Sequence, residues 1–228
     1  VGRDIIMIIA EQKPLDEILE MISGVERLLV LGCRGCVAVC STGGDKEVGV
    51  LASALRLGRK KAGKPIKIDE ATYVRQCDPE YLEPLKEDGK KYDAVLSMAC
   101  GVGVNFIADR CPDVNVLPAL NTSFYGANLS SGEWAEMCAG CGACVLHLTG
   151  GLCPVARCAK SLSNGPCGGS VGGKCEINKD LPCIWHQICE KLTSRKQDQL
   201  LREIVPIRDW RPSGHGGPRR RIREDLLP

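Results

Sequence analysis

The chain has 228 residues, a net charge of +2 and only 4% aromatic residues. Nucleic-acid-binding proteins usually present a strongly basic face or aromatic side chains for base stacking, so this composition argues against that class. No apolar run approaches the ~18 residues of a membrane-spanning helix, and the N-terminal segment turns acidic too early for a signal peptide. We therefore expect a cytoplasmic protein that binds neither nucleic acid nor membranes.

The first half of the chain alternates between helical and strand patterns. The expected helices are 13–23, 45–63, 78–92 and 104–111, and the expected strands are 27–32, 65–69, 93–99 and 114–120. Such alternation predicts the α/β class, with an open, Rossmann-like parallel sheet.

The periodicity is lost beyond residue 128. The segment is rich in glycine, cysteine and proline and has few large apolar residues, so it cannot fold on apolar burial alone and would need bound metal. A helical pattern returns at 183–204, and a Gly/Pro-rich tail follows that either docks on a partner or stays solvated. We expect three parts: an α/β domain at 1–128, a cysteine-rich domain at 129–190, and a C-terminal helix and tail at 191–228.

Cysteine is the most informative residue type in this chain. There are fifteen cysteines, an odd number, and nine of them lie between residues 138 and 189. In a reducing cytosol, cysteine at this density indicates metal binding or redox chemistry rather than disulfides.

The first candidate metal site follows the strand expected at 27–32. The segment LGCRGCVAVCSTGG places three cysteines in one loop: Cys33, Cys36 and Cys40. The carboxyl edge of a parallel sheet is where such folds bind ligands. A [4Fe–4S] cluster needs a fourth thiolate, for which Cys100 after the third strand is preferred and Cys77 after the second is the alternative. Cys111 is expected to be an ordinary buried thiol.

The second candidate site has eight cysteines within 46 residues. They are Cys138, Cys141, Cys144, Cys153, Cys158, Cys167, Cys175 and Cys183. The run CAGCGAC, followed by LCP, is similar to the bacterial ferredoxin pattern that holds a [4Fe–4S] cluster. Structural zinc, which also uses C-x2-C pairs, is the main alternative, although histidine is scarce. The spacing leaves open two clusters or one cluster with one zinc ion. Cys189 is expected to belong to the core.

These motifs resemble a known family. The segment 133–185, with NGPCGG and KCE, resembles the cysteine-rich C-terminal domain of methylenetetrahydrofolate reductases. The first half, with VLGCRGCVAVCSTGG, VRQCD and YDAVLSMACGVGV, resembles the small iron–sulfur subunit of that enzyme in acetogenic and related anaerobic bacteria. The resemblance supports a metal-binding role for the cysteines of both candidate sites.

The resemblance also implies a function. It implies a subunit that carries two [4Fe–4S] clusters, or three, with zinc as an alternative at one site. Its partner would be a flavin-binding TIM-barrel subunit, with FMN or FAD on that partner only, in the Wood–Ljungdahl pathway. Because the chain shows no folate site or poised acid–base pair, we expect an electron-relay subunit that is not itself a catalyst. A further electron-donor module is a second expected partner, and a purely structural metal module is the alternative function.

Overall fold

The computed structural model describes residues 8–220, 222, 223 and 225. The chain divides into two compact units, Val1–Ala135 and Glu136–Pro228, which we call the first and second units. The earliest N-terminal residues and residues 226–228 of the expected tail lie outside the description. None of the helices in the described ranges is both long and apolar enough to cross a bilayer.

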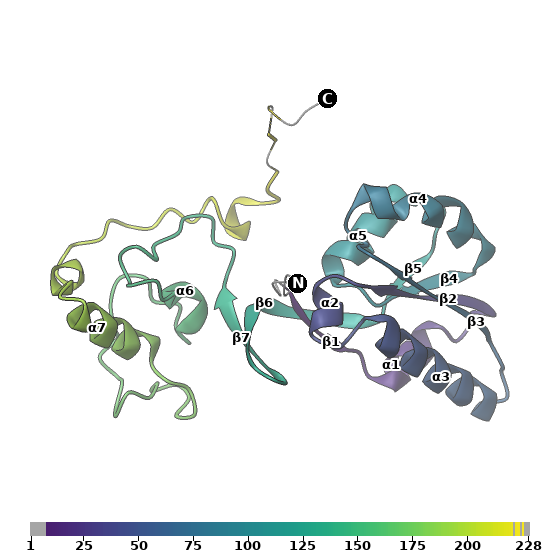
Figure 1. The fold of residues 1–228 in the computed structure, drawn as a ribbon, viewed down its shortest axis with the longest axis horizontal. Helices are drawn as coiled ribbons and strands as arrows, with labels where there is room; N and C mark the ends of the chain where they lie inside the picture. The colour runs from purple at the N-terminus through teal and green to yellow at the C-terminus, as the bar shows by residue number, and fades with distance from the viewer. Residues whose placement is uncertain (1–7, 221, 224, 226–228) are drawn as a thin grey trace. The chain divides into compact units, whose positions relative to one another are not determined.

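A parallel sheet of four strands organises the first unit, as the sequence predicts (Figure 1). Its order is β3-β2-β4-β5, with Leu28 of β2 opposite both Ile68 of β3 and Ala94 of β4. The strands are β2 (Arg27–Cys33), β3 (Lys67–Tyr73), β4 (Ala94–Ser97) and β5 (Val116–Pro118). The helices are α1 (Leu15–Met21), α2 (Cys36–Val39), α3 (Asp45–Lys61), α4 (Pro79–Asp88), the 3-10 turn η1 (Gly89–Lys91) and α5 (Gly101–Arg110).

Strand β2 is buried on both faces because its side chains alternate between two helical layers. Leu28 and Val30 pack on the side of α1 and α3, whereas Leu29 and Leu31 pack on the side of α4 and α5. The two helix pairs therefore cover opposite faces of the sheet (Figure 1). The first unit thus has a complete apolar core in two layers.

A second, antiparallel sheet was not predicted. Its order is β1-β6-β7, formed by β1 (Ile9–Gln12), β6 (Leu120–Ser130) and β7 (Glu133–Cys138). The sequence of β6 lacks the apolar alternation of a half-buried strand because most of its side chains are exposed. The last expected strand therefore continues into a second strand after Pro118.

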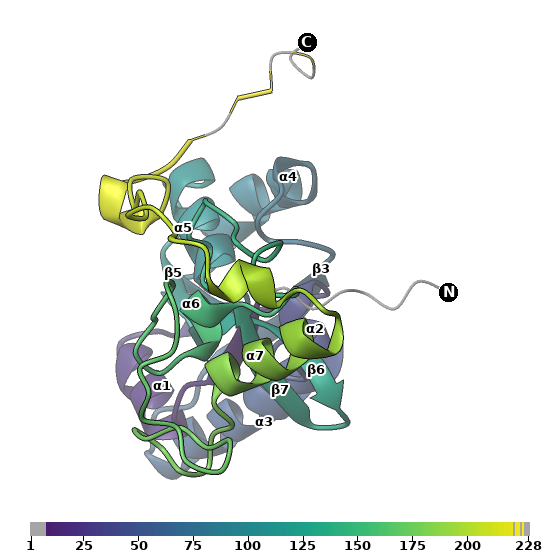
Figure 2. The ribbon, with the colours of Figure 1, turned by 90° about the vertical axis from the view of Figure 1, so that its left-hand side faces the viewer.

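The second unit contains little regular structure. It has α6 (Pro154–Arg157), α7 (Ile184–Ser194) and the 3-10 turns η2 (Asp198–Leu201) and η3 (Gly214–Gly216), joined by long loops (Figure 2). Its buried apolar cluster is formed by one face of α7: Ile184, Trp185, Ile188 and Leu192. The predicted helix at 183–204 ends ten residues early, at Ser194, and Lys196 has a φ of 57° that no α-helix continues.

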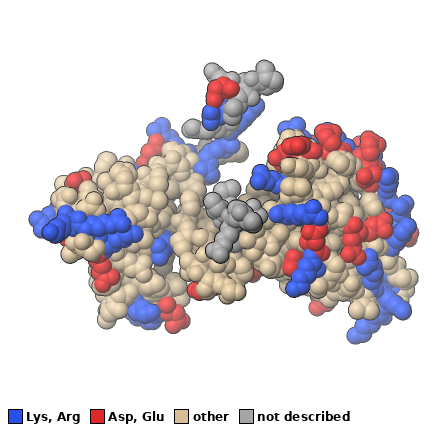
Figure 3. Space-filling view, viewed as in Figure 1, with Lys and Arg blue, Asp and Glu red and all other residues tan. Residues whose placement is uncertain are grey.

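Surface charge on the first unit is mixed. Figure 3 shows Lys and Arg side chains interspersed with Asp and Glu on the face that it presents. Several form ion pairs with near neighbours in the sequence, such as Lys86 with Glu83 on α4 and Lys91 of η1 with Asp88. Such exposed pairs contribute little to stability.

Candidate metal centres

Four cysteines line one pocket at the carboxyl end of the parallel sheet. Cys33 ends β2, and Cys100 lies between β4 and α5. The connection after β2 leads to α3 on one face of the sheet, whereas the connection after β4 leads to α5 on the other face. Open α/β sheets bind ligands where successive connections diverge in this way. We call the four residues, Cys33, Cys36, Cys77 and Cys100, the sheet-edge group.

The thiols of the sheet-edge group lie close enough to influence one another. Burial raises the pKa of Cys33; the backbone N–H groups of Gly35 and Gln76 lower it, and the thiols of Cys100 and Cys36 raise it. Burial, followed by the neighbouring thiols of Cys33 and Cys100, also raises the pKa of Cys77. A cation bound among these sulfurs would favour their thiolate forms.

A buried glutamine connects the segments that carry this group. Gln76 is fully buried, and its Nε2 donates to the carbonyls of Leu31 at 2.9 Å and Gly32 at 2.8 Å. Its Oε1 accepts from the Ser97 hydroxyl at 2.6 Å. These bonds fix the loop of Cys77 against the ends of β2 and β4, so the side chain positions three cysteine-bearing segments. Sequence reasoning missed Gln76, for which adjacency to Cys77 was the available signal.

Cys40, the third cysteine of the first motif, is not brought to this pocket. It lies in a separate small apolar cluster with Ile9, and its Sγ is 3.2 Å from Thr42 Oγ1. The short helix α2 separates it from Cys36, since the two residues lie at opposite ends of that helix. Cys111 is buried in the cluster between the sheet and α4 and α5, as predicted.

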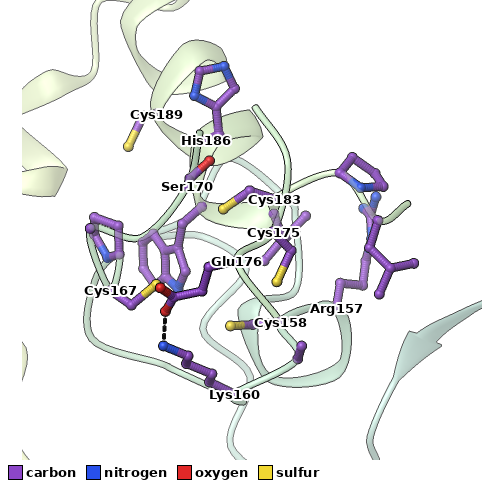
Figure 4. A pocket seen from close by; sticks show the side chains of 17 residues that line it. Arg157, Cys158, Lys160, Cys167, Ser170, Cys175, Glu176, Cys183, His186 and Cys189 are labelled. Atoms are coloured by element: carbon purple, nitrogen blue, oxygen red, sulfur yellow. Dashed lines mark hydrogen bonds and ion pairs between the residues drawn. The ribbon is translucent and has the colours of Figure 1, made fainter. Parts of the chain in front are cut away.

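A second group of cysteines surrounds a pocket within the second unit. Its members, Cys158, Cys167, Cys175 and Cys183, come from separate loops and from the start of α7 (Figure 4). We call them the pocket group. The pocket has a volume of about 190 Å³, several times the ~30 Å³ share of one water molecule in the liquid. It therefore has room for a metal ion or a small cluster.

Backbone amides and charged side chains add to the pocket group. The N–H groups of Asn178 and Ile177 lower the pKa of Cys175, which favours its thiolate. Lys160 and Glu176 form an ion pair at the rim (Figure 4). Cys189, expected in the core, is half-buried and lines this pocket. Sequence reasoning also missed His186, which lies at the rim with its Nε2 3.2 Å from Glu190 Oε1.

The remaining cysteines lie near the start of the second unit. Cys138, at the end of β7, and Cys141 and Cys144, in the loop that follows, are called the loop group. The N–H of Gly140 lies 3.4 Å from Cys138 Sγ. Cys153 precedes α6, where its Sγ accepts from the N–H of Ala156 at 3.5 Å. Amides directed at sulfur are typical of metal–thiolate loops.

In the part of the chain that the structure describes, no three Cys, His, Asp or Glu side chains are arranged to hold a metal ion as they stand. The sulfurs of the sheet-edge and pocket groups surround pockets without converging on one point. All fifteen cysteines are unpaired. Metal binding by these groups therefore stays a prediction, in which the ion would draw the thiolates together.

Comparison with known families gives one match. Residues 117–211 match the family described as "Methylene-tetrahydrofolate reductase C terminal". This part of the chain is related to methylenetetrahydrofolate reductase. The match includes the loop group, Cys153, the pocket group and α7, which agrees with the resemblance seen in the sequence. No curated protein and no solved structure matches the chain.

Proposed function

We propose that the chain is the iron–sulfur, electron-transfer subunit of a methylenetetrahydrofolate reductase complex. It would pass electrons to the flavin of a TIM-barrel catalytic subunit in the Wood–Ljungdahl pathway, in the reducing cytoplasm. The family match supports the association with the reductase. Three groups of unpaired thiols support metal binding.

The sheet-edge group is the observation on which the electron-transfer role rests. It lies in a unit whose sheet already has an apolar core on both faces. Metal is therefore not needed to fold this unit, in contrast with small domains that metal holds together. A metal site that contributes little to folding, at the edge where such sheets bind ligands, points to a role in chemistry.

The donor set of this group fits an iron–sulfur cluster. Cys33, Cys36, Cys77 and Cys100 supply four thiols, and the backbone N–H groups of Gly35 and Gln76 lower the pKa of Cys33. A cluster bound there would supply reversible one-electron chemistry. The protein residues would set its solvent exposure: Cys33 and Cys100 are buried, whereas Cys77 is exposed.

A structural role for metal is the second candidate function, and the second unit favours it. That unit has one small buried cluster on α7, and its loops are organised around cysteines. Zinc or iron held by the pocket group would replace the missing core. The two roles are compatible, since they concern different groups of cysteines.

The sheet-edge assignment is tested by metal analysis of anaerobically purified protein. Iron, zinc and acid-labile sulfide are measured per chain for the parent, for Cys36→Ser and for Cys40→Ser. We expect Cys36→Ser to lose the iron of one site and Cys40→Ser to retain it, because Cys40 lies outside the pocket. Equal iron content in all three proteins would contradict the assignment.

Electron transfer is tested separately with the purified complex. The reduced chain is mixed with its oxidised flavoprotein partner, and flavin absorbance is followed. Cys36→Ser should slow flavin reduction while the complex stays assembled. Flavin reduction at the parental rate in an iron-depleted complex would leave only the structural role.

A further inference from the structure

The C-terminal segment returns to the loop group within the second unit (Figure 1). Arg208 Nη2 lies 2.7 Å from Cys141 Sγ and also donates to the carbonyl of Ala143. Further along, Arg219 Nη1 donates to the carbonyl of Gly140 at 2.6 Å. Two arginines more than sixty residues from the loop therefore bind its sulfur and its backbone.

The loop is shaped to accept this segment. Gly142 has a φ of 79°, and a Cβ built on it would lie 2.4 Å from the carbonyl oxygen of Pro212. Only glycine allows both this backbone conformation and this close approach. The segment is also ordered by its own contacts, since the guanidinium of Arg208 stacks 4.8 Å from the Trp210 ring centroid and Ser213 is buried.

Arg208 lacks the negative partner that a partly buried cation needs. Its Nε is buried and makes no hydrogen bond, and among the described residues no carboxylate forms an ion pair with it. Nearby Arg211, by contrast, pairs with Asp209 at 2.8 Å. An unpaired cation removed from water is costly, so the site calls for a negative charge beside Cys141.

We infer that Arg208 is the counter-charge of a metal centre bound by the loop group, and that residues 208–219 form a strap that covers it. This inference rests on the proposed function, because it takes metal to be bound at Cys138, Cys141 and Cys144. Metal centres held by several thiolates carry net negative charge, which the Arg208 guanidinium offsets. Arg208 is a positioning residue: its charge stabilises the reduced, more negative state, and the strap limits loss of metal to solvent.

The charge is tested by potentiometric titration of the full-length, anaerobically purified protein. Arg208→Gln should shift one midpoint potential to a more negative value, and Arg208→Lys should retain most of the parental potential. Arg202→Gln is the matched control, because Arg202 is an exposed arginine of the same C-terminal region. Identical potentials in Arg208→Gln and Arg202→Gln would overturn the charge assignment.

The strap is tested without any redox measurement, by the rate at which a colorimetric chelator extracts metal. Gly142→Ala should speed extraction about 10-fold, the usual order for loss of a contact that supports a metal ligand. Gly132→Ala is the control: Gly132 also has a positive φ, of 81°, but a Cβ there meets nothing within 4 Å. Equal extraction rates in the two variants would overturn the strap.

The outcomes separate this inference from the proposed function. In one outcome the protein binds iron, while Arg208→Gln leaves the midpoint potentials unchanged and Gly142→Ala leaves the rate of metal extraction unchanged. That result would contradict this inference and leave the proposed function standing. If the protein binds zinc but no iron, the electron-transfer function is contradicted. The chelator experiment then still tests whether the strap slows metal loss. Protein that binds no metal at all rejects both.

Discussion

The two units differ in how much apolar core they contain. The first encloses a parallel sheet between two helical layers, so buried leucine, isoleucine and valine side chains hold it together. The second buries one face of α7, consists mostly of loops, and carries nine of the fifteen cysteines. Under the proposed function, metal bound by cysteines would serve chemistry in the first unit and would also serve folding in the second.

The largest expected difference between the two units is their response to removal of metal. We expect chelation under anaerobic conditions to unfold the second unit and to leave the first folded, since structural metal contributes roughly 10–16 kcal/mol to small metal-dependent domains. Hydrogen–deuterium exchange measures the two units separately. Peptides of α7 should lose protection, whereas peptides of β2 should keep it. Re-addition of metal is the control. Unchanged protection of α7 would show that apolar burial suffices there.

A smaller effect, confined to the first unit, is expected from Gln76→Leu. The substitution removes one hydrogen bond each from the carbonyls of Leu31 and Gly32 and from the hydroxyl of Ser97, at about 1–3 kcal/mol for each group that stays unsatisfied. The Leu31 carbonyl keeps its bond from the N–H of Met98 at 2.8 Å. Urea unfolding of the full chain measures the loss, and metal analysis should show weaker retention by the sheet-edge group. Gln12→Leu is the control, because Gln12 makes one exposed bond to the carbonyl of Thr42. Equal effects of the two substitutions on stability and metal retention would show that the hydrogen bonds of Gln76 do not position the sheet-edge group.

The smallest effect expected is a pH dependence at the opposite end of the same sheet. Asp93 Oδ2 accepts from the N–H groups of Arg27 at 2.8 Å and Glu26 at 2.9 Å, and these bonds lower its pKa. Its stabilising contribution is present above the unfolded value near 3.9 and is lost as pH falls through the lower, folded value. Asp93→Asn should therefore be slightly less stable than the parent at neutral pH, and the difference should shrink in acid. Urea midpoints at pH 7 and at about pH 3 check this sign, and a difference that grows in acid would contradict it.

The elements with strong local patterns were predictable. The strand at 27–32 and the helix at 45–63 agree closely with β2 and α3, because a continuous apolar run and an amphipathic repeat each allow one structure in this context. Strand β6 was missed because pairing with β1 and β7, rather than its own apolar pattern, makes it a strand. The helix beginning at 183 was predicted too long, since Ile204 is 97% exposed and has no apolar surface to pack against.

The site shows the same division. Spacing identified Cys33, Cys36 and Cys100 as neighbours, because topology brings the ends of parallel strands to one edge. The same spacing included Cys40, which the turn of α2 places elsewhere. Sequence proximity does not determine which pocket or apolar cluster a thiol at the end of a short helix joins, and it carries no signal for a contact such as that between Arg208 and Cys141.

The sequence by itself determined the α/β class of the first unit and the relation of residues 117–211 to the C-terminal region of methylenetetrahydrofolate reductase. These follow from periodicity, composition and motif, which are local properties of the chain. Only the tertiary structure decided that Cys77 joins Cys33, Cys36 and Cys100, that Gln76 ties their segments together, and that Arg208 lies on Cys141. Such contacts join residues far apart in sequence, so they exist only once the packing of the fold has fixed where each loop ends.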